Sequence, residues 1–219
     1  METSLKAIKG VAIDLLWLKP EPVPELPFLV RHPYFQNNVT VLPHSNQLID
    51  IIQDEEALQK VSKLMQEQIE KSKSVMKIFM LLLPQYRLTF FKYVNQYLSD
   101  EDFKDMLLYS WIMVEKPSND ANVTQSEILK WFRQLNYVSN LSGVVEIYRG
   151  VTDESGRNGI SWTLNKEKAE WFANRFKENG IVYRAKVKAS NILYYIDDRD
   201  EDEIIVDPKK LMQIEKLCS

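Results

Sequence analysis

The pattern of apolar residues changes near residue 141, and this change limits the folds that the chain can adopt. Before residue 135, apolar side chains recur at the three- and four-residue spacing of amphipathic helices. Two such stripes are Leu58, Val61, Leu64, Met65 and Ile69, and Phe90, Phe91, Val94, Tyr97 and Leu98. After residue 141 the apolar runs become short and partly alternating, which is typical of strands. We therefore expect an α+β fold, with a mainly helical lobe at 1–140 and a small mixed or antiparallel β core at 141–219.

Local signals place the ends of several helices. Ser99 with Asp102, and Thr124 with Glu127, have the spacing of an N-cap and its acidic partner three residues later. The most apolar run, VMKIFMLLL from residue 75 to 83, is too short to span a bilayer. We expect this run to form a buried helix that Pro84 ends.

Six of the nine prolines lie between Pro20 and Pro43. The stretch KPEPVPELP excludes a regular helix or a central strand, because proline lacks the backbone donor that both require. We expect 20–43 to be an extended segment packed on the domain surface rather than a flexible linker, because it carries large apolar side chains. These are Leu26, Phe28, Leu29, Tyr34 and Phe35.

The second part of the chain contains short strand-like runs and one helix. The helix is expected to follow Asn165, which can cap its start, and Asn179–Gly180 can end it. The expected strands are 144–148 with Arg149 and Gly150 at its end, 160–164, 181–188, 192–196, 203–206 and 211–217. Few Gly or Ser residues separate the two parts, and 136–143 is the only candidate joint, so we expect one compact unit.

Composition excludes several classes of function. A net charge of −3 offers no electrostatic case for wrapping nucleic acid. The single cysteine, Cys218, excludes a disulfide within the chain and a cysteine-based metal site, and two histidines are too few for a usual zinc site. Asp14 interrupts the apolar N-terminal stretch and no small-residue cleavage site follows it, which argues against a signal peptide. We expect a cytoplasmic protein that needs neither a metal nor a membrane.

Polar residues at two of the expected strands have chemical meaning. Arg149 ends an apolar strand and precedes Gly150. The guanidinium of Arg149 offers N–H donors in a fixed geometry, and a phosphate can approach the backbone at Gly150 closely. Ser161 and Thr163 are two residues apart and therefore share one face of their strand. The alternative for Arg149 is that it is only a surface arginine at a strand end. The alternative for Ser161 and Thr163 is that they are ordinary strand residues, since threonine favours strands.

Two acidic residues precede a third strand. Glu201 and Glu203 share a face if Asp202 already belongs to the strand, and mutual repulsion would then make one of them hold its proton more tightly. A carboxylate at the start of a buried strand can stabilise positive charge that develops on a sugar. The alternative is that the acidic run 197–202 is only a solvated loop.

Arg, Ser-x-Thr and Glu-x-Glu, in that order on successive strands, resemble the Arg–Ser–Glu class of mono-ADP-ribosyltransferases. The resemblance covers residues 143 to 217, and the order with its strand context carries it. The middle element departs from the usual Ser-Thr-Ser, because Trp162 stands at its centre, where we expect it to face the opposite side of the strand. Such domains with helical N-terminal extensions are associated with bacteriophages and mobile elements of bacteria.

The resemblance implies a β core of ADP-ribosyltransferase type and NAD as co-substrate, with release of nicotinamide. By this analogy Arg149 binds an NAD phosphate and shapes the pocket. Ser161 orients the catalytic glutamate and supports the nicotinamide-side ribose, and Thr163 buttresses the site. The backbone N–H and C=O of Gly150 form hydrogen bonds with the nicotinamide amide. The candidates for an aromatic ring stacked on nicotinamide are Trp162, Trp171, Phe172 and Phe176, of which Trp171 and Phe172 are also candidates for the helix core.

The same analogy makes Glu203 the catalytic glutamate, which binds the ribose 2′-hydroxyl and stabilises the oxocarbenium-like transition state. Glu201 positions or deprotonates the acceptor, and a glutamate at this place is associated with arginine acceptors. The acidic loop before it suggests a protein partner with a basic surface. The expected function is therefore NAD-dependent mono-ADP-ribosyl transfer to a protein arginine. The alternatives are an NAD glycohydrolase and a non-catalytic interaction protein on the same fold.

Overall fold

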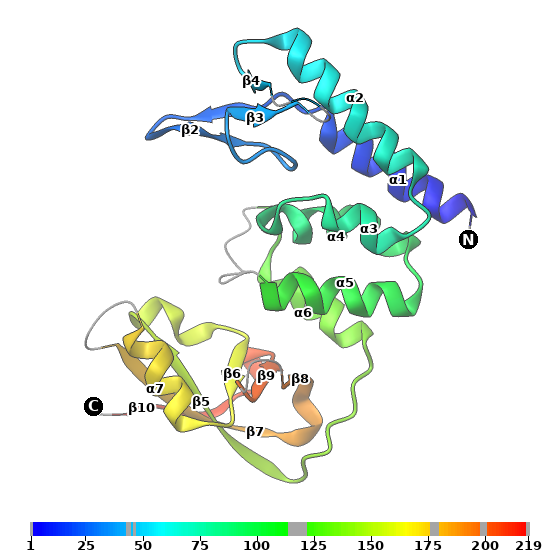
Figure 1. Cartoon of the computed structure of the whole chain (residues 1–219). Helices are drawn as coiled ribbons and strands as arrows, with labels where there is room; N and C mark the ends of the chain where they lie inside the picture. Colours follow the sequence, from blue (N-terminus) through cyan, green and yellow to red (C-terminus); the bar gives the residue numbers. More distant parts are fainter. Residues whose placement is uncertain are drawn as a thin grey trace. The chain divides into compact units, whose positions relative to one another are not determined.

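The structure, a computed structural model, describes residues 2–42, 45, 47–113, 122–175, 180–197 and 201–217. Contacts divide the chain into two compact units, Met1–Val123 and Thr124–Ser219 (Figure 1). We expected one unit with a joint at 136–143, and the division falls earlier. The helix at 125–134 therefore belongs with the sheet instead of with the N-terminal helices.

The α-helices in the described residues of the first unit are α1 (Glu2–Leu16), α2 (Glu55–Lys71), α3 (Val75–Met80), α4 (Arg87–Val94) and α5 (Asp100–Met113). The two apolar stripes predicted α2 and α4, but α4 ends at Val94, before Tyr97 and Leu98 of its stripe. The predicted cap at Ser99 is confirmed, because its Oγ accepts a hydrogen bond from the backbone N–H of Asp102 at 3.1 Å. The apolar run after residue 75 is helical only to Met80, and Pro84 instead begins a short 3₁₀ turn, Pro84–Tyr86. Ile78 and Phe79 are fully buried, as expected of this run.

The proline-rich segment is extended, as predicted, and forms short antiparallel strand pairs. β1 (Glu21–Val23) pairs with β2 (Leu26–Arg31), and β3 (Val39–Val41) pairs with β4 (Leu48–Asp50). The prediction of packing is right for Tyr34, which is buried and donates its hydroxyl to the backbone oxygen of Ala12 at 2.9 Å. It is wrong for Phe28, which is 64% exposed.

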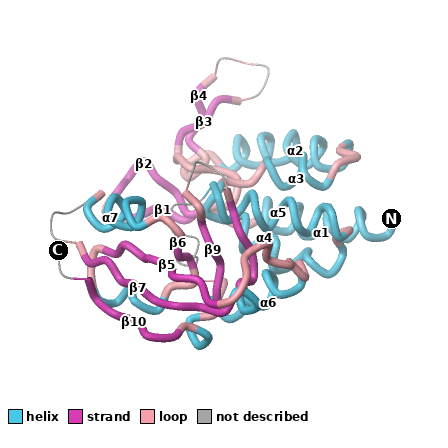
Figure 2. The backbone as a smooth tube through the Cα atoms, turned by 90° about the horizontal axis from the view of Figure 1, so that it is seen from below, coloured by secondary structure: helices cyan, strands magenta, loops and turns pink. Residues whose placement is uncertain are grey.

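The second unit is built on a six-stranded antiparallel sheet, so the chain is an α+β protein (Figure 2). The sheet order is β10-β7-β5-β6-β9-β8. Its strands are β5 (Val144–Val151), β6 (Ser161–Thr163), β7 (Ile181–Lys188), β8 (Ile192–Ile196), β9 (Glu203–Val206) and β10 (Met212–Leu217). Two helices accompany them, α6 (Gln125–Gln134) and α7 (Lys166–Asn174). The predicted strands are confirmed, although β5 continues through Arg149 and Gly150 to Val151.

The sheet consists of two three-stranded halves with a narrow connection. β5 and β7 pair along their whole length, from Val144↔Lys188 to Val151↔Ile181. By contrast, β5 and β6 share the single pair Tyr148↔Thr163. We call β10, β7 and β5 the long half, and β6, β9 and β8 the short half.

α7 packs mainly against the long half, with some contact to β6, and α6 packs against the short half. α7 lies along β5 (Figure 1), and Gly150 permits this close approach, because a Cβ there would meet the backbone oxygen of Ala169 at 1.8 Å. α6 begins with the predicted capping box between Thr124 and Glu127 and packs on β8. Apolar side chains from both halves form one buried cluster, which includes Ile147, Trp162, Ala185 and Ile204.

Candidate active site

Pairing of β6 with β9 brings two of the sequence elements together. Thr163 lies opposite Glu203, and Ser161 lies opposite Ile205. The two strands are adjacent in space although α7, β7 and β8 separate them along the chain. Because directly opposed residues point to the same side of a sheet, Ser161, Thr163 and Glu203 share one face.

Arg149 spans the gap where the ladder between β5 and β6 ends. Its Nε donates to the backbone oxygen of Gly156 at 2.8 Å, and its Nη1 donates to the backbone oxygen of Ser161. The loop before β6 covers the guanidinium closely, because a Cβ on Gly159 would lie 2.2 Å from the Arg149 Cζ. Arg149 therefore fastens this loop and the short half of the sheet to β5.

The charge of Arg149 is coupled to Glu203. Burial lowers the pKa of the Arg149 guanidinium to about 10, while the negative charge of Glu203 acts in the opposite direction. Arg149 thus remains protonated at neutral pH. Glu203 begins β9 and is only 9% exposed, so a nearby positive charge is the partner that a carboxylate in this position needs.

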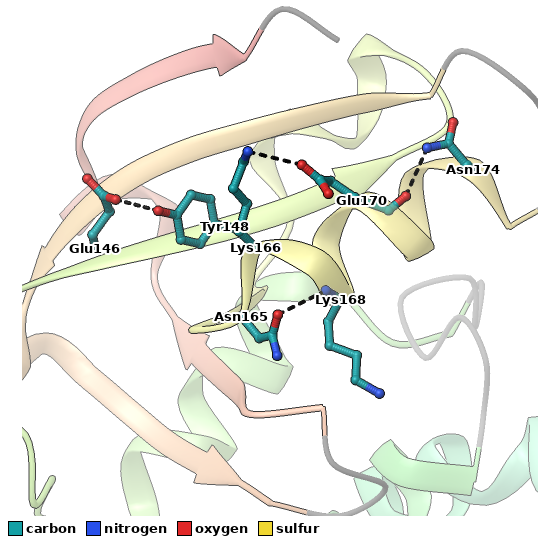
Figure 3. Close-up of polar contacts among 7 residues, drawn as sticks. All are labelled: Glu146, Tyr148, Asn165, Lys166, Lys168, Glu170 and Asn174. Carbon is teal, nitrogen blue, oxygen red and sulfur yellow. Dashed lines mark hydrogen bonds and ion pairs between the residues drawn. The ribbon is translucent and has the colours of Figure 1, made fainter.

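Thr163 links the acidic segment to the start of α7. Its Oγ1 donates to the backbone oxygen of Glu201 at 2.6 Å and accepts from the backbone N–H of Asn165 at 3.0 Å. The Asn165 side chain in turn accepts from the backbone N–H of Lys168 at 3.2 Å and caps α7, as predicted (Figure 3). This arrangement is the contact that a buttressing role would require.

The two glutamates do not continue one regular strand. β9 begins at Glu203, and Asp202 lies outside it with a φ of +47°, in the left-handed region. The condition for a shared face, that Asp202 belongs to the strand, is therefore not met. Glu201 is partly exposed whereas Glu203 is buried, so the two carboxylates occupy different environments.

The structure assigns Gly150 and Trp162 structural contacts. The close approach at Gly150 is made by α7, through Ala169 and Ala173. Trp162 faces the opposite side from Ser161 and Thr163, as expected, and is 2% exposed within the apolar cluster. Its Nε1 donates to the backbone oxygen of Gly159 at 2.9 Å. A ring buried in this way presents no face to a ligand.

The other aromatic candidates lie on or after α7. Trp171 is 54% exposed, so it is not a core residue of the helix, and Arg175 lies over its ring at 5.0 Å. Phe172 is partly buried and packs edge-on against Trp171, with ring centroids 5.0 Å apart. Phe176 lies outside the described residues, as do Asp198 and Asp200 of the acidic loop.

Sequence reasoning missed two features of this region. The loop glycines Gly156 and Gly159, which receive the Arg149 side chain, were visible only as part of a polar stretch. Tyr195, which donates its hydroxyl to Asp202 Oδ1 at 2.7 Å, carried no signal beyond its place in a strand. Both are contacts across the connection between consecutive strands, β5 to β6 and β8 to β9, and residue spacing does not give the geometry of such a connection.

An open cavity of about 690 Å³ lies at the other end of β5, beside Val144, Lys188 and Ile192. None of the candidate site residues lines it. Within the described ranges, no three His, Cys, Asp or Glu side chains gather as metal ligands. In the same part of the chain, no helix combines the length and the apolar character that a membrane crossing requires.

Comparison with protein-family models finds no match, and searches of curated proteins and of solved structures find no significant match either.

Proposed function

We propose that this protein is an NAD-dependent mono-ADP-ribosyltransferase that modifies an arginine of a protein acceptor. The observation that carries the proposal is the pairing of β6 with β9, which puts Glu203 opposite Thr163 and on the face of Ser161. Arg149 reaches the same strand through the Ser161 backbone oxygen, and its charge interacts with Glu203. Three elements that only follow one another in the sequence thus meet at adjacent strands of one sheet.

In the proposed reaction the bond between ribose C1′ and the nicotinamide nitrogen breaks, and its electron pair leaves with nicotinamide. Glu203 stabilises the positive charge that develops on the ribose, since its carboxylate is buried and held at the start of β9. An acceptor guanidine nitrogen then forms the new bond to C1′. Its proton passes to Glu201, whose side chain is partly exposed and so accessible from the acceptor side.

Arg149 combines two tasks in this proposal. Two of its N–H groups hold the backbone oxygens of Gly156 and Ser161, which fixes the loop before β6 against β5. An arginine has five N–H donors, so others are left for a diphosphate oxygen of NAD. Gly150 and Trp162 serve the scaffold, so Phe172, which is partly buried, and Trp171, which is exposed, remain candidates for stacking on nicotinamide.

The test is nicotinamide release from NAD by the wild type and by Glu203→Gln, each with and without a basic acceptor protein. Removing one electrostatic stabiliser should slow release by about 10²- to 10³-fold. Glu215→Gln is the matched control, because Glu215 is an exposed residue of β10 paired with Arg184. This variant should keep the wild-type rate.

The products separate the proposal from its alternatives. Acceptor-dependent release with ADP-ribose attached to arginine supports the transferase. Acceptor-independent release of free ADP-ribose would instead identify an NAD glycohydrolase. If the wild type releases no nicotinamide under either condition, the proposal is wrong and the fold serves a non-catalytic interaction.

A further inference from the structure

The backbone just before Glu203 is held from both neighbouring strands. From β6, Thr163 Oγ1 donates to the backbone oxygen of Glu201 at 2.6 Å. From β8, the Tyr195 hydroxyl donates to Asp202 Oδ1 at 2.7 Å. The two residues that precede Glu203 therefore each have a side-chain hydrogen bond that ties them to the sheet.

Asp202 needs such a tie, because its φ of +47° is a conformation that residues other than glycine adopt at a cost. Aspartate is among the residues that tolerate it, since a short polar side chain can form a compensating hydrogen bond. Here the bond goes to Tyr195, and the backbone oxygen of Asp202 also accepts from the N–H of Leu164 at 3.2 Å. The turn thus has defined contacts on both its side chain and its backbone.

We infer that Tyr195 and Asp202 form a clamp that positions Glu203 for the reaction, an inference that rests on the proposed function. Tyr195 lies opposite Ile204, the residue after Glu203, so the clamp spans the point where β9 begins. By holding Asp202, the hydroxyl fixes the peptide that joins Asp202 to Glu203, and with it the direction in which the Glu203 side chain leaves the strand. Tyr195 and Asp202 are positioning residues and do not touch the substrate.

The tyrosine is suited to this role because it keeps its proton. The hydrogen bond to Asp202 raises the pKa of the Tyr195 hydroxyl, and burial and the negative charges of Asp202 and Asp197 act in the same direction. The hydroxyl is therefore a donor across the whole range in which enzymes are commonly assayed.

The experiment measures kcat and KM for nicotinamide release in Tyr195→Phe, Asp202→Gly and Asp202→Asn. Tyr195→Phe and Asp202→Gly remove one end of the hydrogen bond each, and glycine also tolerates the positive φ. A misplaced catalytic group should lower kcat by about tenfold to a hundredfold with little change in the KM for NAD. Asp202→Asn should restore kcat to near the wild-type value, because its amide oxygen can accept from Tyr195 and asparagine also adopts this φ.

The matched control is Tyr194→Phe, the neighbouring tyrosine of β8, whose ring packs against Phe132 and Tyr137 at centroid distances of 6.2 and 4.9 Å. It should keep the wild-type kcat. An unchanged kcat in Tyr195→Phe, or a fall in Asp202→Asn as large as in Asp202→Gly, would overturn the clamp while the wild-type activity still supported the proposed function.

A wild type that releases no nicotinamide would refute the proposed function, and the clamp would then be tested by amide hydrogen exchange at residues 201–203. With the clamp present, Tyr195→Phe should speed exchange there by about tenfold or more relative to Tyr194→Phe. Equal exchange in the two variants would refute the clamp independently of any activity.

Discussion

The helical unit buries Arg87 and the sheet unit partly buries Arg149, and the two guanidinium groups have different kinds of partner. Arg87 in the helical unit lies over the rings of Phe79 and Tyr109, at 5.3 and 5.1 Å, and its Nε donates to the backbone oxygen of Leu82. Arg149 in the sheet unit binds two backbone oxygens and is coupled to Glu203. The first arrangement only packs a helix core, whereas the second joins two halves of a sheet beside a buried carboxylate.

The two units also differ in how the interior of each is packed. The helical unit fills its interior with large apolar side chains such as Phe79, Phe90 and Phe91. The sheet unit brings backbone against backbone, with α7 over Gly150. A substitution that adds volume should therefore lower the stability of the sheet unit more than that of the helical unit. A change in charge should lower the stability of the unit that contains the affected group.

The largest expected effect is that of Gly150→Ala. The new methyl group would meet the backbone oxygen of Ala169 at 1.8 Å and the backbone nitrogen of Ala173 at 2.6 Å, and backbone atoms cannot rotate away. We expect the free energy of unfolding of the sheet unit to fall by about 3 kcal/mol. Urea denaturation followed by tryptophan fluorescence measures it.

Gly10→Ala is the matched control in the helical unit, because nothing lies within 4 Å of a Cβ placed there in α1. It should stabilise the protein by about 0.5–1 kcal/mol, since alanine replaces glycine inside a helix. Equal destabilisation by both substitutions would break the proposed contrast in packing.

Acid should weaken the helical unit through His32, which is buried and has a pKa lowered from 6.5 to about 4. Burial is the main cause. The neutral ring also uses both nitrogens, accepting from the N–H of Tyr34 at Nδ1 and donating from Nε2 to the backbone oxygen of Leu18. Because the folded pKa lies below the unfolded one, the unfolded chain binds more protons between pH 6.5 and 4. Stability is therefore lost as the pH falls through this window.

The loss attributable to His32 amounts to roughly 3 kcal/mol from pH 7 to pH 4. Measuring unfolding free energies across this range in the wild type and in His32→Gln gives its share, because the variant lacks the titrating group. A pH dependence that is the same in both proteins would contradict the assignment.

Lysine substitutions test the difference between the two arginines. Arg149→Lys should lower the free energy of unfolding by about 2 kcal/mol, because one ammonium cannot reach the backbone oxygens of both Gly156 and Ser161. Arg87→Lys should cost about 1 kcal/mol by weakening its contacts with two rings. Only Arg149→Lys should also slow nicotinamide release, and a similar slowing in Arg87→Lys would remove the functional distinction.

Removal of two hydroxyl groups, one in each unit, should have small effects on stability. Thr163→Val and Ser99→Ala should each lower stability by about 1 kcal/mol, the first through the bond to Glu201 and the second through the cap of α5. The two variants should differ in nicotinamide release, which Thr163→Val slows and Ser99→Ala leaves unchanged. Equal rates would show that Thr163 is only a structural residue.

Local structure was largely predictable from the sequence, because its signals lie within a few residues of one another. The capping box at Thr124, the cap at Asn165 and the strand at 181–188 were read correctly from the sequence. The exposed ring of Phe28 and the early end of α3 at Met80 were not, because both depend on neighbours that spacing does not identify.

The candidate site divides in the same way. Spacing alone indicated that Ser161 and Thr163 share a face and that Trp162 points away from them, and the register agrees. Spacing could not show that α7 packs directly on the backbone of Gly150. Nor could it show that Asp202 breaks the alternation between Glu201 and Glu203. These two facts follow from contacts with distant elements.

The sequence by itself determined which segments of the sheet unit become helices and strands, since propensity, capping and periodicity act over a single turn or strand. Only the tertiary structure decided that β6 pairs with β9 and that the β5–β6 ladder ends after one pair. Strand pairing is a choice among many non-local partners, and it is made by burying the apolar faces of all six strands at once. That choice brings Arg149, Ser161 and Glu203 together.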